Sequence, residues 1–140
     1  MAYIGQPVPS TVVDIGQLKV SDGKSVDVTV PAAAGTVAGA FCVLDGFFGL
    51  ALQTIVAAEN TAGATIALQI EQAEYVTDQI DTAKTFKKGA TLYFDPAKSV
   101  FTDDSKVSGA FVVGRVSEAK SAENTIQFIL YPQADAAVTA

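Results

Sequence analysis

Residues 26–52 constrain the fold more than any other part of the chain. The stretch opens with three valines spaced two apart, which is the pattern of a strand with one buried face. Pro31 ends that strand, and a run of small residues follows it. Two apolar segments, 40–44 and 47–52, then flank Asp45-Gly46, a dipeptide typical of a tight hairpin turn. This stretch predicts antiparallel β-structure.

Further strand-like segments follow toward the end of the chain. Residues 65–70 and 125–131 each place three apolar side chains on one face. Segments 90–94 and 99–102 flank an Asp-Pro-Ala-Lys turn, and 107–118 is a longer apolar segment. We expect a mainly β fold of eight or nine strands, forming a single compact antiparallel β-barrel or sandwich over residues 15–131.

Two local predictions accompany this fold. Residues 15–30 predict a hairpin that turns at residues 21–24, because apolar residues alternate on both sides of that turn. Residues 78–88 predict the one short helix of the fold, since Ile80, Ala83 and Phe86 form an apolar stripe and the glycine after residue 88 suits a helix end.

The first fourteen residues predict an extended N-terminal arm, because two prolines exclude a helix there. This arm either packs on its own domain or contacts a partner. At the other end, residues 132–140 predict a short C-terminal tail. The arm carries five apolar anchors: Tyr3, Ile4, Val8, Val12 and Val13.

Charge and hydropathy exclude two classes of partner. The net charge is −6, and nine Lys and Arg residues are scattered among fifteen acids, so we expect no nucleic acid partner. The longest nearly apolar run, 39–52, is broken by Asp45 and is shorter than the ~20 residues of a membrane span. We therefore expect no membrane partner. The amino terminus lacks the regions of a secretory signal, so we expect synthesis in the cytoplasm.

The residue types argue against catalysis. The chain has no histidine and one cysteine, Cys42, which removes the commonest general base and the usual zinc ligands. We interpret the acids at 71, 74, 78, 81, 103 and 104 as surface charge rather than as glycosidase carboxylates or a calcium site. We predict that the protein is not an enzyme and has no catalytic residues, no metal site and no cofactor.

Several short motifs follow one another in a specific order: Val28-Thr29-Val30-Pro31, Val37-Ala38-Gly39, Phe47-Phe48-Gly49-Leu50-Ala51, Lys88-Gly89-Ala90-Thr91-Leu92-Tyr93-Phe94-Asp95, Val113-Gly114-Arg115-Val116 and Ile126-Gln127-Phe128-Ile129-Leu130. They all lie within residues 26–130. Their order resembles that of the phage structural cement family, also called capsid decoration or head stabilisation proteins.

The resemblance implies a structural virion protein on the outer capsid surface of a bacteriophage. Such a protein binds the head after expansion, bridges and stabilises major capsid protein subunits, and forms a homotrimer. The five anchors of the arm are then candidate capsid contacts. Phe47, Phe48 and Tyr93 are candidate oligomer-interface residues, because adjacent aromatic residues in a strand cannot both face one core. The alternative for Phe47 and Phe48 is a strand covered on both faces.

A second function stays open at this point. A β-sandwich module of a fibre or adhesin that binds carbohydrate or a cell surface would have a similar strand pattern. It would also present exposed aromatic platforms and often bind Ca²⁺. The absence of tryptophan and the presence of only four tyrosines weigh against it.

Overall fold

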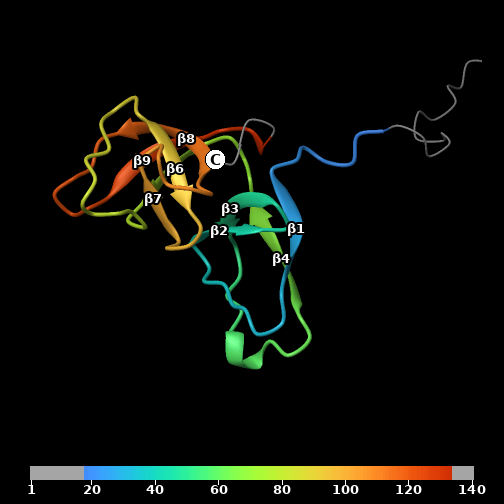
Figure 1. Ribbon diagram of the computed structural model, residues 1–140. Coiled ribbons are helices and arrows are strands. Elements are labelled where there is room, and N and C mark those ends of the chain that lie inside the picture. Colours follow the sequence, from blue (N-terminus) through green and yellow to red (C-terminus); the bar gives the residue numbers. More distant parts are fainter. Residues whose placement is uncertain (1–17, 134–140) are drawn as a thin grey trace, which may run out of the picture.

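The computed structural model describes residues 18–133, which form two antiparallel sheets (Figure 1). A four-stranded sheet has the order β1-β4-β3-β2, and a five-stranded sheet has the order β5-β9-β8-β6-β7. The mainly β prediction is confirmed. The strands are β1 (Ser25–Val30), β2 (Phe41–Leu44), β3 (Phe47–Ala51), β4 (Ala64–Gln69), β5 (Glu74–Thr77), β6 (Thr91–Asp95), β7 (Val100–Thr102), β8 (Phe111–Glu118) and β9 (Ile126–Leu130).

The four-stranded sheet curls around a small core of its own. Val28 of β1 lies opposite Ile66 of β4, and both are buried together with Leu68. The Asp45 carboxylate accepts a hydrogen bond of 2.7 Å from the backbone N–H of Thr29, which ties the β2–β3 turn to β1. This bond brings the two ends of the curled sheet together, and we call the curled four-stranded sheet the half-barrel.

The β2–β3 turn is the tight hairpin that the sequence predicts. Asp45 and Gly46 both have positive φ, at 51° and 81°. That pair of values is typical of a type I′ turn, whose twist matches the twist of the flanking strands.

An aromatic cluster joins the two sheets. Phe48 of β3 lies 4.9 Å from Phe94 of β6, and Phe41 of β2 lies 5.4 Å from Phe128 of β9, measured between ring centroids. Phe101 of β7 packs among all four rings. Several of these pairs meet edge to face, which aromatic rings prefer over a direct sandwich. The main core of the protein therefore lies between the sheets.

Two glutamine side chains pair with backbone groups of β2 and β3. The Gln79 amide donates to the carbonyl of Phe41 and accepts from its N–H, both at 2.9 Å, and it also donates to the carbonyl of Ser99. The Gln133 amide makes the same pair of bonds to Phe48, at 2.8 and 3.1 Å. Each amide bonds to both the N–H and the carbonyl of one strand residue, which are the groups that a neighbouring strand would otherwise pair with.

Residues 78–88 do not form the predicted helix. Ile80 makes a parallel bridge beside β7. Phe86 is fully buried with φ of +51°, and its N–H donates to the Asp103 carboxylate at 3.0 Å. Burial of these two side chains at separate places in the core overrides the weak helical pattern. Within residues 18–133, the one helical element is the three-residue 3-10 helix η1 (Ala57–Glu59).

The predicted hairpin of residues 15–30 is also wrong where the structure describes it. Residues 18–24 form no strand, and Leu18 and Val20 are 58% and 92% exposed. β1 pairs instead with β4, whose aliphatic residues complete the half-barrel core. Residues 15–17, the predicted arm and residues 134–140 of the predicted tail lie outside the described residues.

Candidate interaction surface

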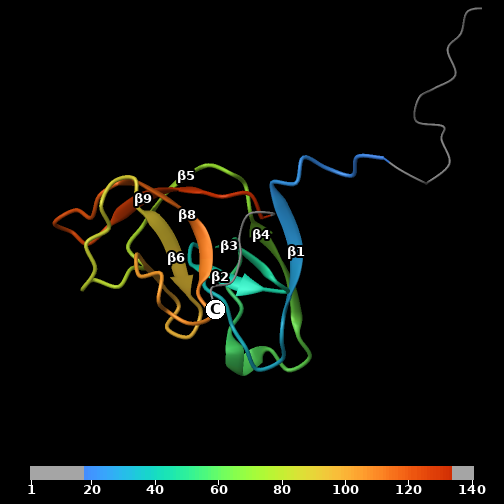
Figure 2. The ribbon, with the colours of Figure 1, turned by 45° about the horizontal axis from the view of Figure 1, so that its top comes forward.

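Two loops, residues 31–40 and 52–63, form a lobe at one end of the four-stranded sheet (Figures 1 and 2). We call this pair of loops the lobe. The first loop leaves β1 and returns to β2, and the second joins β3 to β4 and carries η1. Ala34 and Ile55 pack against the core of the half-barrel, so the base of the lobe is continuous with the body.

Backbone and hydroxyl hydrogen bonds join the two loops. Thr36 and Ile55 form an antiparallel bridge, with N–H to carbonyl distances of 3.0 and 3.1 Å. The Thr36 hydroxyl donates to the carbonyl of Gln53 at 2.8 Å, and the N–H of Ala38 donates to the Thr54 hydroxyl at 3.0 Å. These bonds fix the register of one loop against the other.

The buried side chain of Asn60 organises the first loop. Its amide nitrogen donates to the carbonyls of Pro31 at 2.8 Å and Ala34 at 3.0 Å, and lies 3.4 Å from that of Val30. The backbone carbonyl of Asn60 accepts a hydrogen bond from the backbone N–H of Ala33 at 2.7 Å. Ala33 has φ of +66°, a strained value for alanine that these surrounding bonds maintain.

Replacing Asn60 by leucine is expected to lower the free energy of unfolding by about 2–3 kcal/mol. Leucine has a similar size but donates no hydrogen bond, so the carbonyls that Asn60 serves lose their partner. Urea unfolding followed by circular dichroism measures the change, and hydrogen exchange locates it in the lobe. The exposed neighbour Thr61 provides the control, since Thr61→Ala is expected to change stability by less than about 0.5 kcal/mol. Equal stability of Asn60→Leu and the wild type would contradict this account of the lobe.

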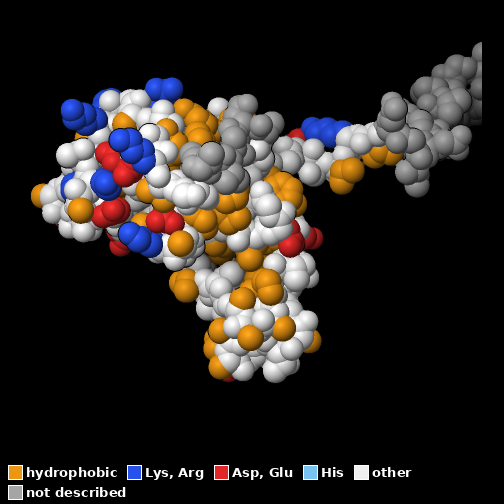
Figure 3. All heavy atoms as spheres, in the orientation of Figure 1, with side chains coloured by type: hydrophobic (Ala, Val, Ile, Leu, Met, Phe, Trp, Pro, Cys, Tyr) orange, Lys and Arg blue, Asp and Glu red, His pale blue; other side chains and the backbone are white. Residues whose placement is uncertain are grey.

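The surface of the lobe is apolar and nearly uncharged. Val37, Leu52 and Val56 are 63%, 50% and 51% exposed, and most of its alanines are exposed as well. Its 22 residues hold one charged side chain, Glu59, whereas the whole chain holds 24, as nine basic and fifteen acidic residues. Figure 3 shows the visible face of the lobe as mostly apolar and uncharged atoms, with most Lys and Arg side chains over the other end. These exposed apolar side chains on a surface with one charge make the lobe the candidate interaction surface.

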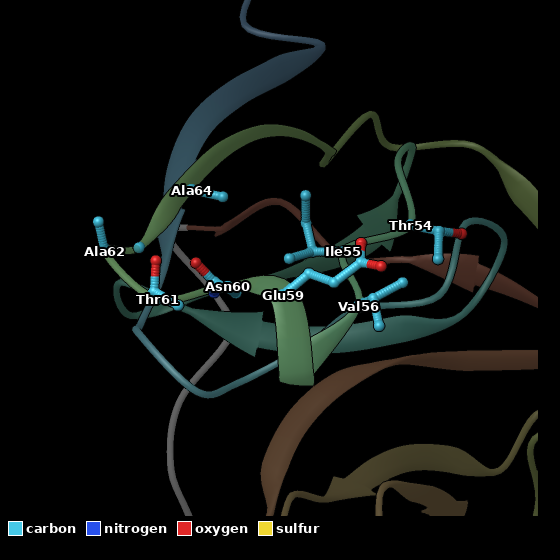
Figure 4. A pocket seen from close by; sticks show the side chains of 9 residues that line it. Thr54, Ile55, Val56, Glu59, Asn60, Thr61, Ala62 and Ala64 are labelled. Atoms are coloured by element: carbon cyan, nitrogen blue, oxygen red, sulfur yellow. The ribbon is translucent and has the colours of Figure 1, made fainter.

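A shallow hollow of about 360 Å³ lies on one side of the lobe (Figure 4). It is lined by residues 54–56 and 59–64, which supply one carboxylate and no histidine, cysteine or lysine. The amide nitrogen of its one asparagine, Asn60, is already bonded to backbone carbonyls. The hollow is therefore a shallow surface of mixed polar and apolar character.

Titratable groups elsewhere have structural roles. Asp103 accepts the bond from Phe86, and Asp104 pairs with Lys84 at 3.4 Å. A hydrogen bond from the Lys106 backbone N–H, helped by Lys84, lowers the pKa of Asp104. Burial raises the pKa of the half-buried Cys42 thiol, which opposes formation of a nucleophilic thiolate. Across residues 18–133, no three His, Cys, Asp or Glu side chains are grouped to hold a metal ion.

Comparison with known proteins identifies the family. A family model described as phage cement protein matches residues 20–132, which include both sheets and the whole lobe. The chain belongs to the phage cement protein family. Cement proteins are structural phage proteins that associate with the capsid of the virion. No curated protein and no solved structure matches the chain.

The three candidate interface residues of this cement protein, Phe47, Phe48 and Tyr93, lie in three different environments. Phe48 is fully buried in the aromatic cluster, so its side chain faces the interior of the protomer. Phe47 points to the other face of β3 and is half-buried against the half-barrel core. Strand β3 is thus covered on both faces. Tyr93 is half-buried on β6 in the other sheet. Phe47 and Tyr93 remain proposals as contacts between copies.

The other candidates of this cement protein lie outside the described residues. They are the five apolar anchors of the arm, Tyr3, Ile4, Val8, Val12 and Val13. Among residues 18–133, no helix is long and apolar enough to cross a membrane.

Sequence reasoning missed the lobe as a surface. The small residues after Pro31 indicated only the end of a strand, and residues 53–63 were not singled out. The available signal was the scarcity of charge, since residues 31–40 contain no charged side chain and residues 52–63 contain one.

Proposed function

We propose that this cement protein binds the exterior of the phage head after expansion and bridges neighbouring major capsid protein subunits as a homotrimer. The observation that carries the proposal is the family match over residues 20–132. Many copies bound to one lattice convert modest individual contacts into a large collective stabilisation. This role needs no turnover, and we expect no enzymatic activity.

The distribution of aromatic side chains supports a cement role over sugar binding. The large apolar side chains that are exposed among residues 18–133 are Val, Leu and Ile. Each described Phe and Tyr is buried or half-buried, and most of them belong to the core between the sheets. A carbohydrate-binding module would instead present aromatic rings as a platform. The carbohydrate-binding alternative thus receives no support from this surface.

We propose that the arm makes the capsid contacts, through its five apolar anchors. The chain enters the fold at β1, which is an edge strand of its sheet. An extended segment can add a strand to the edge of another sheet, where main-chain hydrogen bonds give affinity and alternate side chains give specificity. The prolines and spaced apolar residues of the arm suit that mode of binding.

Deleting residues 1–13 is expected to weaken head binding by about 100-fold or more, equivalent to about 3 kcal/mol, because the anchors are removed. The folded body is expected to keep its circular dichroism spectrum and its melting temperature. Binding is measured by co-sedimentation with expanded heads that lack the protein, and deletion of residues 134–140 provides a control. Unchanged binding by the arm deletion would reject the arm as the contact. Failure of the full chain to sediment with heads would reject the cement function itself.

A further inference from the structure

We propose that the lobe is the surface through which copies of this chain contact one another. The inference rests on the proposed function and assigns a surface to its homotrimer. Interfaces between identical subunits are more apolar than other protein surface, and charged residues are depleted at their centre. The lobe has both properties, with Val37, Leu52 and Val56 exposed and Glu59 as its one charge.

The net charge of the chain favours an identical copy as the partner of the lobe. Copies gathered around a symmetry axis bring equivalent surfaces close together, so charges of one sign near the axis lie near the same charges of the other copies. Each chain has a net charge of −6. Of its 24 charged side chains, all except Glu59 lie outside the lobe, which leaves 23. The lobe is therefore a surface through which acidic copies approach each other with little repulsion.

The construction of the lobe also lowers the entropic cost of association. Alanine and glycine lose no side-chain rotamer freedom when they are buried, and these residues make up much of the lobe. The Thr36–Ile55 bridge and the Asn60 amide already hold both loops in place. Little further ordering is needed on contact, which favours binding by a preorganised surface.

The lobe and the entry of the chain into the fold lie at opposite ends of β1. Residues 18–24 lead into the Ser25 end of β1, and the lobe begins at Pro31, directly after its other end (Figures 1 and 2). At about 3.3 Å per residue, the six residues of β1 span roughly 17 Å between them. The lobe therefore lies away from the point at which the chain enters the fold.

A second exposed apolar pair provides a matched control. Val76 of β5 and Ile129 of β9 are 66% and 42% exposed on the five-stranded sheet. Ile129 lies opposite Glu74 on one side and Arg115 on the other, and both of these residues are exposed. Charged residues therefore flank this pair. A substitution at Val76 shows what the loss of an exposed apolar side chain does when the lobe is left unchanged.

The first test changes charge on the lobe of the full chain. Glu59→Gln is expected to tighten self-association by about fivefold, because it removes repulsion between identical carboxylates. Val56→Asp is expected to weaken it by about tenfold or more, and Val76→Asp is expected to leave it unchanged. Sedimentation equilibrium measures the association, and circular dichroism verifies that each variant is folded. A Val56→Asp variant that keeps its oligomeric state and loses head binding would overturn the inference, because the lobe would then face the shell.

The second test measures proximity directly. Cys42→Ala removes the native thiol, and Val56→Cys then places one thiol on each lobe. A bifunctional maleimide is expected to join copies through position 56, both in solution and on heads, whereas Val76→Cys in the same background is expected to stay unjoined. Head binding without joining at position 56 would overturn the lobe inference while leaving the cement function intact. Joined copies that fail to bind heads would support the lobe contact and reject the cement function.

Discussion

Replacing Phe48 by alanine is expected to lower the free energy of unfolding by about 3–5 kcal/mol. Phe48 is fully buried and contacts the rings of Phe41, Phe94 and Phe101, so alanine would leave a cavity between the two sheets. A domain of this size is stable by about 5–15 kcal/mol, so the loss is a large part of the total.

Urea unfolding followed by far-ultraviolet circular dichroism measures the effect of Phe48→Ala. The control is Val76→Ala, which truncates a side chain that is 66% exposed and is expected to cost less than about 0.5 kcal/mol. A loss below 1 kcal/mol for Phe48→Ala would show that the aromatic cluster does not join the sheets. This prediction also means that the role of β3 between copies has to be tested at Phe47, because changes at Phe48 act through folding.

Replacing Gly49 by alanine is expected to cost about 2–3 kcal/mol. The added Cβ would overlap the carbonyl oxygen of Gln69 and lie 2.9 Å from Leu68 Cγ and 3.1 Å from Ile70 Cγ2. Because the nearest of these atoms belongs to the backbone of β4, it cannot move aside without disturbing the half-barrel. The close approach of β3 to β4 therefore requires glycine.

Thermal and urea unfolding of Gly49→Ala are compared with those of Gly23→Ala. Gly23 has φ of +67° with no atom within 4 Å of an added Cβ, so its substitution costs only the left-handed backbone strain of about 1 kcal/mol. Equal losses for the two variants would indicate that no steric overlap limits residue 49, and would contradict the packing described for the half-barrel.

The sequence predicted those parts of the fold that local pattern determines. The Asp45-Gly46 hairpin needs two positive φ values in adjacent residues, and that requirement is visible in the dipeptide itself. Residues 126, 128 and 130 alternate as predicted and are buried on β9. In both cases neighbouring residues carry the whole signal.

The errors arose where distant residues decide the structure. The valines of β1 pair with β4, which is separated from it by two other strands in sequence. Phe86 adopts its left-handed conformation beside the Asp103 carboxylate, seventeen residues away, and this contact excludes the predicted helix. Strand β5 is only four residues long, and two of its residues, Glu74 and Val76, are exposed, so its pattern was too short to predict.

The candidate surface was predicted only in part. The lobe depends on bonds between residues that are 16 to 30 positions apart, such as those of Asn60 and Thr54, and no local pattern announces them. Phe47 and Phe48 were correctly predicted to face opposite ways, but both faces of β3 prove to be covered within one protomer. The resemblance to cement proteins, in contrast, is confirmed by the family match.

The central claim is that this protein reinforces a phage shell by binding to it. The most direct measurement is the temperature at which filled, expanded heads release their DNA, with and without added full-length protein. We predict that bound protein raises this temperature until the sites on the lattice are saturated. Heads that carry saturating amounts of the protein but release DNA at the same temperature as bare heads would contradict the account.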